Sequence, residues 1–212
     1  MTGSINGSLT KQKILDCAAT MFAEKGFTET STRDLAEAVG LNPASMYYHF
    51  PSKNAILEHM MDEYSEYNTD IFTERDITGI LRENPTSDGI LSCLQLAFPP
   101  ERAEFFAKVL CVLLQEQLRN PIVRAYVAER IILRAEVNVK KIIIVLMELG
   151  VISRDTDPDY WMKVNSSLVY SFASRMMLGI GDNTPGFAGM GMAGMLKYTF
   201  DMLLEKCGLQ PA

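Results

Sequence analysis

A short stretch near the N-terminus, LNPASMYYHFPSK from Leu41 to Lys53, gathers side chains that could recognise a polyanion by hydrogen bonding. Two tyrosines, a serine, a histidine and a lysine surround one proline, and none of these positions is acidic. The whole chain, by contrast, has 26 acidic and 20 basic residues. Hydroxyl and ammonium groups can donate to phosphate oxygens and base edges, whereas a carboxylate on the same face would repel a duplex. The pattern indicates a local nucleic-acid contact surface on an otherwise acidic protein.

Bulk composition is typical of an ordinary globular protein. The chain has 212 residues, of which 48% are hydrophobic and 22% charged, and this length can bury a sizeable core. The four scattered cysteines form no CxxC pair, which favours buried free thiols in a reducing compartment. The apolar runs are far shorter than the roughly 20 residues that a membrane-spanning helix needs, and the N-terminus lacks an apolar signal core. We therefore expect a cytoplasmic protein with no membrane partner.

Helical periodicity runs through the chain, and no segment shows the alternation of a half-buried strand. Ser31 with Asp34 forms a capping-box-like pair, Asn42-Pro43 is typical of an N-cap followed by the first helical residue, and Ser52 is a third N-cap candidate. The sequence predicts an all-α fold with helices over residues 10–25, 31–39, 42–50, 52–72, 87–98, 101–118, 120–149, 157–180 and 188–206.

The second and third of these helices meet at Gly40-Leu41-Asn42, a turn of the length and composition that a helix-turn-helix uses. A helical wheel at 100° per residue separates the third helix into faces. Met46 and Phe50 form the inward stripe. The remaining positions point outward or flank it: Ala44 and Tyr48 opposite the core, Ser45 and Tyr47 on the flanks, and His49 near the core edge.

The outward face suits a recognition helix, whose N-terminal residues meet base edges in the major groove. Ala44 can contact a thymine methyl group, and Ser45 can hydrogen-bond to several bases. Tyr47 and Lys53 can reach phosphates. Alternatives stay open at this stage, because the tyrosines could be ordinary half-buried aromatics and His49 could be a packed structural histidine.

The segment GFTETSTRDLAEAVGLNPASMYYHFPSKNAIL resembles the N-terminal domain of the TetR family of transcriptional regulators. The likeness runs from about Lys11 to Leu57, and its most specific block is Met46 to Lys53. By resemblance, double-stranded DNA is contacted from positions on three helices: Thr32, Arg33, Pro43, Ala44, Ser45, Tyr47, Tyr48, His49 and Lys53. The family mostly represses transcription from palindromic operators, and this is what the resemblance implies here.

Two features depart from the family's pattern. Thr32 stands where the family usually has an apolar residue, so it either touches DNA or serves the helix start. Residues 1–60 also hold five basic side chains against six acidic ones, a net charge of −1. Few cations mean few neutralised phosphates, which predicts a shallow salt dependence of DNA binding.

The resemblance implies a helix-turn-helix domain over residues 1–56 and a larger helical effector-binding and dimerisation domain over residues 57–212. The last two predicted helices are rich in small residues, which lets another backbone approach closely. We expect a homodimer that pairs these helices as a four-helix bundle through Ser167, Ser171, Ser174, Gly189, Gly191 and Gly194. The alternative is that residues 181–194 form a long flexible loop.

The family likeness also implies a small organic effector, which the sequence does not identify. Aromatic and polar residues of the second domain could line its pocket, and the candidates are Phe98, Phe105, Phe106, Tyr126, Asn138 and Tyr170. Packing in the core is the alternative for each of them.

Other classes of function find less support. HExxH, GxSxG, a Walker loop and a GxGxxG after a strand are all absent, and the only histidines are His49 and His59. The sequence therefore predicts no catalytic residues, cofactor or metal. A helical adaptor that binds proteins is the remaining rival, and it would not need the acid-free face of the third helix.

Overall fold

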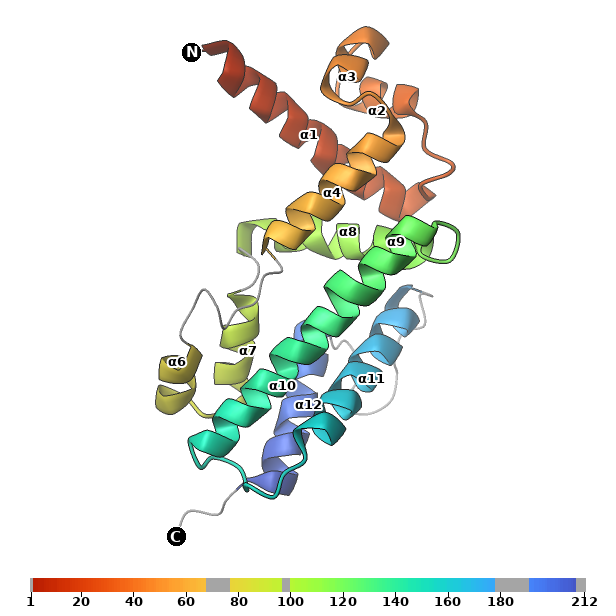
Figure 1. Cartoon of the computed structure of the whole chain (residues 1–212). Coiled ribbons are helices and arrows are strands. Elements are labelled where there is room, and N and C mark those ends of the chain that lie inside the picture. The colour runs from red at the N-terminus through yellow and green to blue at the C-terminus, as the bar shows by residue number, and fades with distance from the viewer. Residues whose placement is uncertain (1, 68–76, 97–99, 178–190, 209–212) are drawn as a thin grey trace. The chain divides into compact units, whose positions relative to one another are not determined.

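The computed structural model describes residues 2–67, 77–96, 100–177 and 191–208 (Figure 1). These residues form helices joined by short turns, and within them no strand occurs beyond one isolated antiparallel bridge between Ile152 and Gly208. The predicted fold class is confirmed: the protein is all-α, with an N-terminal helix-turn-helix and a larger helical remainder.

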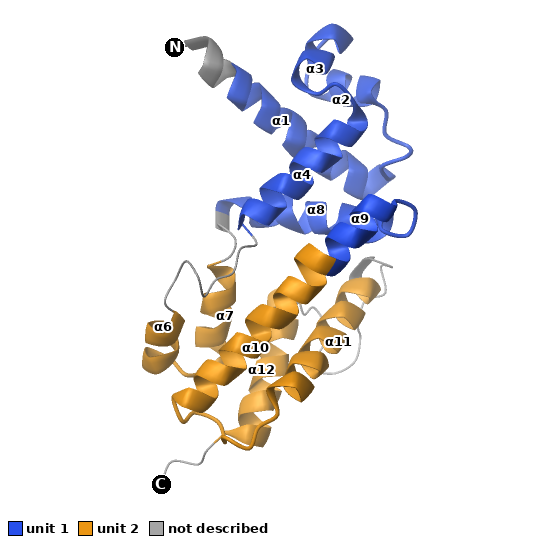
Figure 2. Ribbon diagram, in the orientation of Figure 1, with its two compact units in different colours: residues 1–68, 98–128 blue, residues 69–97, 129–212 orange. Residues whose placement is uncertain are grey.

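The chain folds into two compact units, which Figure 2 shows in different colours. Unit 1 comprises Met1–Asn68 and Phe98–Ala128, and unit 2 comprises Thr69–Ala97 and Glu129–Ala212. The chain thus leaves unit 1, returns to it and leaves again. The predicted domain boundary at residues 56 and 57 divides the chain differently and stays a prediction.

Unit 1 contains the helix-turn-helix and two further helices that come later in the chain. Its elements are α1 (Thr2–Lys25), α2 (Thr32–Ala38), α3 (Pro43–His49), α4 (Lys53–Tyr67), a 3₁₀ turn (Pro100–Arg102), α8 (Ala103–Glu116) and α9 (Pro121–Tyr126). Helix α1 packs against both α2 and α8, so its apolar positions are buried on more than one side. The most deeply buried side chains of the unit include Ile14, Phe22, Leu35, Met46, Ile56, Met60 and Leu113.

Unit 2 is built around three long helices, α10, α11 and α12. Its elements are α6 (Ile77–Glu83), α7 (Ser87–Gln95), α10 (Leu133–Glu148), α11 (Pro158–Met177) and α12 (Met192–Cys207). Helix α11 packs on both α10 and α12, and α12 also packs on α7. The core between them is apolar and includes Leu81, Ile90, Ile142, Leu146, Ile152, Phe200 and Leu203.

Helix ends follow the local rules that the sequence predicted. Asn120 accepts hydrogen bonds from the backbone N–H groups of Ile122 and Val123, and Asp157 accepts from those of Asp159 and Tyr160. Gly150 ends α10 with a φ of +71°, a conformation that favours glycine.

Among the described residues, four helices differ from prediction. Helix α6 (Ile77–Glu83) was not predicted, and α12 begins at Met192, whereas the prediction began at residue 188. Helix α1 begins at Thr2, two turns before the predicted start, because polar and small residues precede the apolar stripe on which that start was based. The single helix predicted over residues 120–149 is instead three segments in series, since a π-helical turn (Val127–Ile132) joins α9 to α10.

Candidate nucleic-acid interface

The start of α2 is held by a reciprocal capping box. The Ser31 hydroxyl accepts from the Asp34 backbone N–H at 3.1 Å, and the Asp34 carboxylate accepts from the Ser31 backbone N–H at 2.8 Å. The Ser31 hydroxyl also donates to this carboxylate at 2.6 Å. These bonds, with the side-chain bond first, lower the pKa of Asp34. The cap therefore holds while Asp34 is ionised and weakens as the pH falls through that lowered pKa.

The turn between α2 and α3 is fixed by glycine geometry and a second cap. Gly40 has a φ of +73°, which L side chains rarely adopt, and the Leu41 N–H donates to Ala36 O at 2.8 Å. Asn42 then accepts from the Ser45 backbone N–H at 2.8 Å, and Pro43 occupies the first turn of α3. The predicted helix-turn-helix is confirmed down to its capping residues.

Helix α3 presents two tyrosines outward over a buried stripe. Met46 and Phe50 are buried, whereas Tyr48 is 86% exposed and Tyr47 55% exposed. The helical wheel is thus confirmed. Pro43 and Ala44 are also exposed, and Ser45 and His49 are partly exposed. The Tyr48 and His49 rings make an edge contact with centroids 5.4 Å apart, so His49 lies beside the outward face.

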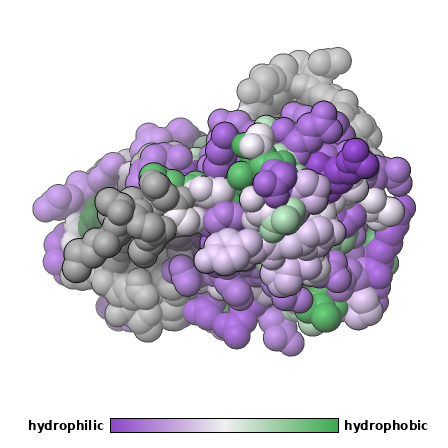
Figure 3. Space-filling model, turned by 90° about the horizontal axis from the view of Figure 1, so that it is seen from above, coloured by the Kyte–Doolittle hydropathy of each residue, from purple (hydrophilic) through white to green (hydrophobic). Residues whose placement is uncertain are grey.

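The surface at this end is polar without being strongly cationic. The face viewed from above in Figure 3 is mostly hydrophilic or near-neutral, and hydrophobic residues appear on it as separate spots. Phenol and hydroxyl groups, which hydrogen-bond without carrying charge, are the main donors on α3. The chemistry available here is hydrogen bonding and stacking more than charge neutralisation.

The predicted contacts on α2 and α4 differ from one another in environment. Thr32 is partly buried as the first residue of α2, and Arg33 beside it is exposed. Lys53, the first residue of α4, has its ammonium group against backbone carbonyls of the loop between α1 and α2. Of these three, Arg33 is the side chain with open access to solvent.

The predicted effector residues are divided between the two units. In unit 1, Phe105 and Phe106 are buried, and the Tyr126 hydroxyl donates to Met61 O at 2.6 Å. In unit 2, Asn138 is buried on α10 and Tyr170 on α11 is 45% exposed. Phe98 lies outside the described residues.

The predicted dimer residues on α11 lie on its solvent side. Ser167 and Ser171 are exposed and Ser174 is partly exposed. Gly191 is the exposed residue before α12 and Gly194 is partly buried in its first turn. Gly189 lies outside the described residues. These positions are accessible within this single chain.

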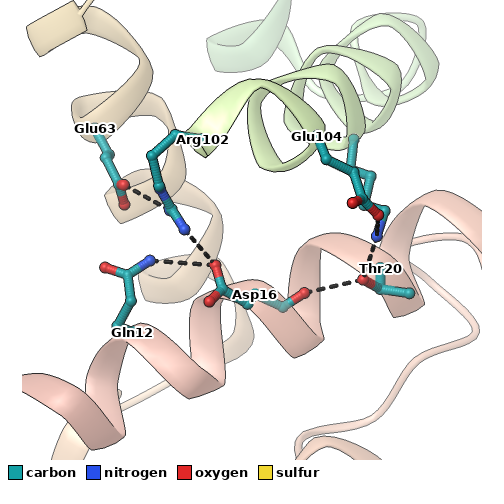
Figure 4. Close-up of polar contacts among 7 residues, drawn as sticks. Gln12, Asp16, Thr20, Glu63, Arg102 and Glu104 are labelled. Carbon is teal, nitrogen blue, oxygen red and sulfur yellow. Dashed lines mark hydrogen bonds and ion pairs between the residues drawn. The ribbon is translucent and has the colours of Figure 1, made fainter. Parts of the chain in front are cut away.

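Arg102, just before α8, carried no signal in the sequence but holds three elements of unit 1 together (Figure 4). Its guanidinium donates to Asp16 of α1 at 2.6 Å and to Glu63 of α4 at 2.7 Å, and it stacks 3.7 Å from the centroid of the Phe105 ring. Further along, in α8, Lys108 donates to the Thr20 hydroxyl of α1 at 3.0 Å. The roles of Arg102 and Lys108 depend on partners far away in the sequence, so the local sequence pattern does not indicate them.

Comparison with known proteins agrees with this geometry. Residues 14–60 match the family described as "Bacterial regulatory proteins, tetR family", and this range contains α2, α3, the second half of α1 and the first half of α4. Residues 14–60 are thus similar to the N-terminal domain of TetR-family regulators. Among the described residues, no group of three or more His, Cys, Asp or Glu side chains could hold a metal ion, and no helix is long and apolar enough to cross a bilayer.

Curated relatives of the TetR-family domain are regulators. The chain is 43% identical over 61 residues to IcaR, the negative transcriptional regulator of the biofilm operon icaADBC in Staphylococcus aureus. It is 39% identical over 57 residues to the probable transcriptional regulator YttP of Bacillus subtilis. These matches cover 29% and 27% of this chain, and only 33% and 28% of the two relatives. The chain therefore spans about a third or less of the length of these two relatives.

Solved structures extend the likeness to the whole fold. The TetR-family regulator PfmR of Thermus thermophilus is 26% identical, with a TM-score of 0.57 over 94% of this chain and 96% of that one. A protein of Saccharomonospora viridis, described as a transcriptional regulator and solved with choline, has a TM-score of 0.67 at 19% identity, over 96% of this chain and 100% of that one. The TetR-family fold is thus shared along almost the entire length.

Proposed function

We propose that the protein is a transcriptional regulator that binds a palindromic operator through α3, as a homodimer, and is released from it by a small organic effector. The observation that carries this proposal is α3 itself: an acid-free helix with Tyr47 and Tyr48 outward over a buried Met46. Such a face suits major-groove readout, and the matched family consists of regulators. Repression is favoured because IcaR is a negative regulator. The place of action is the cytoplasm, where the duplex is.

Operator contacts are proposed for the residues around α3. Ala44, Ser45, Tyr47 and Tyr48 would face base edges and the adjoining backbone. Thr32 and Arg33 at the start of α2, with Pro43 and His49 at the ends of α3, would reach flanking phosphates.

A homodimer would place two such helices on one duplex. Its proposed interface is the exposed face of α11 that carries Ser167 and Ser171, together with the start of α12 near Gly194. Small residues allow helices from two copies to approach closely, and two-fold symmetry would match a palindrome with half-sites about 34 Å apart or a multiple of that.

The proposed effector site centres on Asn138 in unit 2. Its side chain is 4% exposed, and its Oδ1 atom has no hydrogen-bond partner among the described residues. A buried acceptor without a donor costs free energy, which a ligand carrying an N–H or O–H group would recover. We propose such a ligand, organic and largely apolar to suit the surrounding core. The aromatic residues Phe105, Phe106 and Tyr126 would contribute less, since they already pack within unit 1.

The function is tested by selecting random duplex DNA with the purified protein at near-physiological salt and sequencing what is retained. We expect an enriched palindrome whose half-sites are separated by about one helical turn or more. Analytical ultracentrifugation of the protein should show a dimer. If no sequence is enriched by a protein that is folded and dimeric, operator binding is wrong.

Exchanging Asn138 for leucine should stabilise the protein. Removing an unpaired buried acceptor and adding an apolar side chain of similar size should raise the free energy of unfolding by about 1 kcal/mol, or the melting temperature by about 3 °C. The matched control is Asn165→Leu. Asn165 is equally buried, at 6%, but its Nδ2 donates to Thr199 Oγ1 at 2.5 Å, so this variant should melt at a lower temperature. Equal losses in both variants would show that Asn138 is satisfied in the free protein.

Operator binding should depend only weakly on salt. Of the five cations in residues 1–60, Lys13 donates to Val39 O and Lys53 donates to loop carbonyls, which leaves Lys11, Lys25 and Arg33. Each neutralised phosphate adds about −0.9 to the slope of log K against log salt, so each subunit should contribute no steeper than about −3. This slope is measured by fluorescence anisotropy of a labelled operator at salt concentrations from about 50 to about 300 mM. A much steeper value would mean that cations outside this set reach the backbone.

A further inference from the structure

Lys53 stands where family resemblance predicts a phosphate contact, but its surroundings differ from those of a phosphate ligand. Its Nζ donates to the carbonyl oxygens of Phe27 at 2.5 Å, Thr30 at 2.9 Å and Thr28 at 3.3 Å. The same atom lies 4.4 Å from the centroid of the Phe27 ring. We infer that Lys53 is a positioning residue that clamps the loop before α2 onto the start of α4, and that it does not bind the operator backbone.

The number of donors carries this inference. A lysine ammonium has three N–H groups and no acceptor. In Lys53 three carbonyl oxygens take up all three, and the Phe27 ring lies close to the same charge. A phosphate could be bound only if one or more of these contacts were given up. Arg33, which is exposed at the start of α2, faces no such competition.

The clamp encloses the helix-turn-helix. Its two ends, Phe27 and Lys53, lie on either side of the segment that contains α2 and α3. Inside the loop, the buried Thr30 hydroxyl donates to Gly26 O at 2.9 Å, and the next residue, Ser31, is the N-cap of α2. Fixing residues 27–30 therefore fixes where α2 begins.

A second lysine acts in the same way at the far end of α2. Lys13 of α1 donates to Val39 O, the carbonyl of the residue that ends α2, at 3.2 Å. The last carbonyls of a helix lack partners within the helix, so a cation placed there satisfies one of them. Two of the few cations of this domain thus hold backbone in place, one near each end of α2.

The salt dependence of operator affinity distinguishes a positioning role of Lys53 from phosphate binding by Lys53. This readout rests on the proposed function, because it requires an operator. The variants are Lys53→Met, Lys53→Arg and, as a comparator for a solvent-facing cation, Arg33→Met. The probe is the duplex retained in the selection experiment, and thermal melting is measured on the same samples without DNA.

We expect Lys53→Met to melt about 5 °C lower and to bind about tenfold more weakly at every salt concentration, with an unchanged salt slope. Lys53→Arg should show the same losses although it keeps the charge, because a planar guanidinium cannot direct three donors at three converging carbonyls. Arg33→Met should instead lose about 0.9 from the magnitude of the slope, with an unchanged melting temperature.

The inference would be overturned if Lys53→Met lost about 0.9 from the magnitude of the salt slope. It would also be overturned if Lys53→Arg had the melting temperature and operator affinity of the wild type. The melting and hydrogen-exchange readouts need no duplex. If the selection finds no operator, faster amide exchange of residues 27–31 in Lys53→Met would still support the clamp, and unchanged exchange would reject it. Failure of the clamp and failure of operator binding are therefore distinguishable.

Discussion

Replacing Tyr48 with alanine is expected to weaken operator binding by about 10- to 100-fold while the melting temperature stays within a degree or so of wild type. The side chain is the most exposed aromatic on α3, and its ring contacts the ring of the neighbouring His49. Removing it therefore takes little packing from the folded chain. On DNA, the same ring would lie against the groove wall, where it can pack against sugars or a thymine methyl group and donate through its hydroxyl.

The matched control is Tyr160→Ala. Tyr160 is also strongly exposed and also makes an edge contact with its neighbour, Trp161, but it belongs to α11 in unit 2. We expect this variant to bind the operator like wild type. Tyr48→Phe then divides the Tyr48 effect between ring and hydroxyl. Anisotropy titrations at one fixed salt concentration measure the operator affinity of each variant. If Tyr48→Ala bound with wild-type affinity, the proposal that α3 contacts the operator through Tyr48 would be wrong.

The predictable features of α2 and α3 are those that depend on residues within about four positions of one another in the sequence. Ser31 with Asp34 and Asn42 with Pro43 are neighbours along the chain, so their side-chain types are enough to predict which backbone groups they cap. The outward position of Tyr48 likewise follows from helical periodicity once Met46 is placed inside.

The roles of the charged residues were less predictable, because they depend on partners far along the chain. Lys53 reaches carbonyls that lie 23 to 26 residues earlier, and Arg102 reaches Asp16 across 86 residues. A cation at a helix start has the same local pattern whether it faces phosphate or backbone. Only the fold distinguishes the two.

The effector site shows a similar limit for apolar residues. Phe105 and Phe106 have the composition of pocket walls, but Phe106 packs edge-on against Tyr64 and Phe105 lies under Arg102. Aromatic residues of a core and of a pocket look alike in sequence, since both need to be apolar. Asn138 was recognisable as polar in a long helix, but its unpaired oxygen was not.

Exchanging Arg102 for methionine is expected to lower the free energy of unfolding of unit 1 by about 2–3 kcal/mol. Burial by itself would lower the pKa of Arg102, but its hydrogen bonds to Asp16 and Glu63 outweigh this and raise the pKa, so the guanidinium stays charged. The Arg102 and Glu63 side chains are only 19% and 16% exposed. Without the arginine, two carboxylates from α1 and α4 would lose the cation that both face, and Glu63 would be left largely desolvated.

Chemical denaturation with a double-mutant cycle measures this effect. Glu63→Gln removes one carboxylate, so the loss caused by Arg102→Met should be smaller in the Glu63→Gln background than in wild type. The control is Lys140→Met, which breaks an ion pair of similar length, 2.7 Å to Asp159, in which the side chains are 40% and 63% exposed. An exposed pair contributes at most about 1 kcal/mol, so the control should change little.

Operator binding gives the second readout for Arg102. Helix α1 packs on α2, and only a short turn separates α3 from α4, so a contact that ties α1 to α4 constrains the helices that would read the duplex. We expect Arg102→Met to weaken binding although the residue itself is not proposed to contact DNA. Equal small losses of stability in Arg102→Met and Lys140→Met, with unchanged operator affinity, would show that α8 packs on α1 and α4 through its apolar face alone.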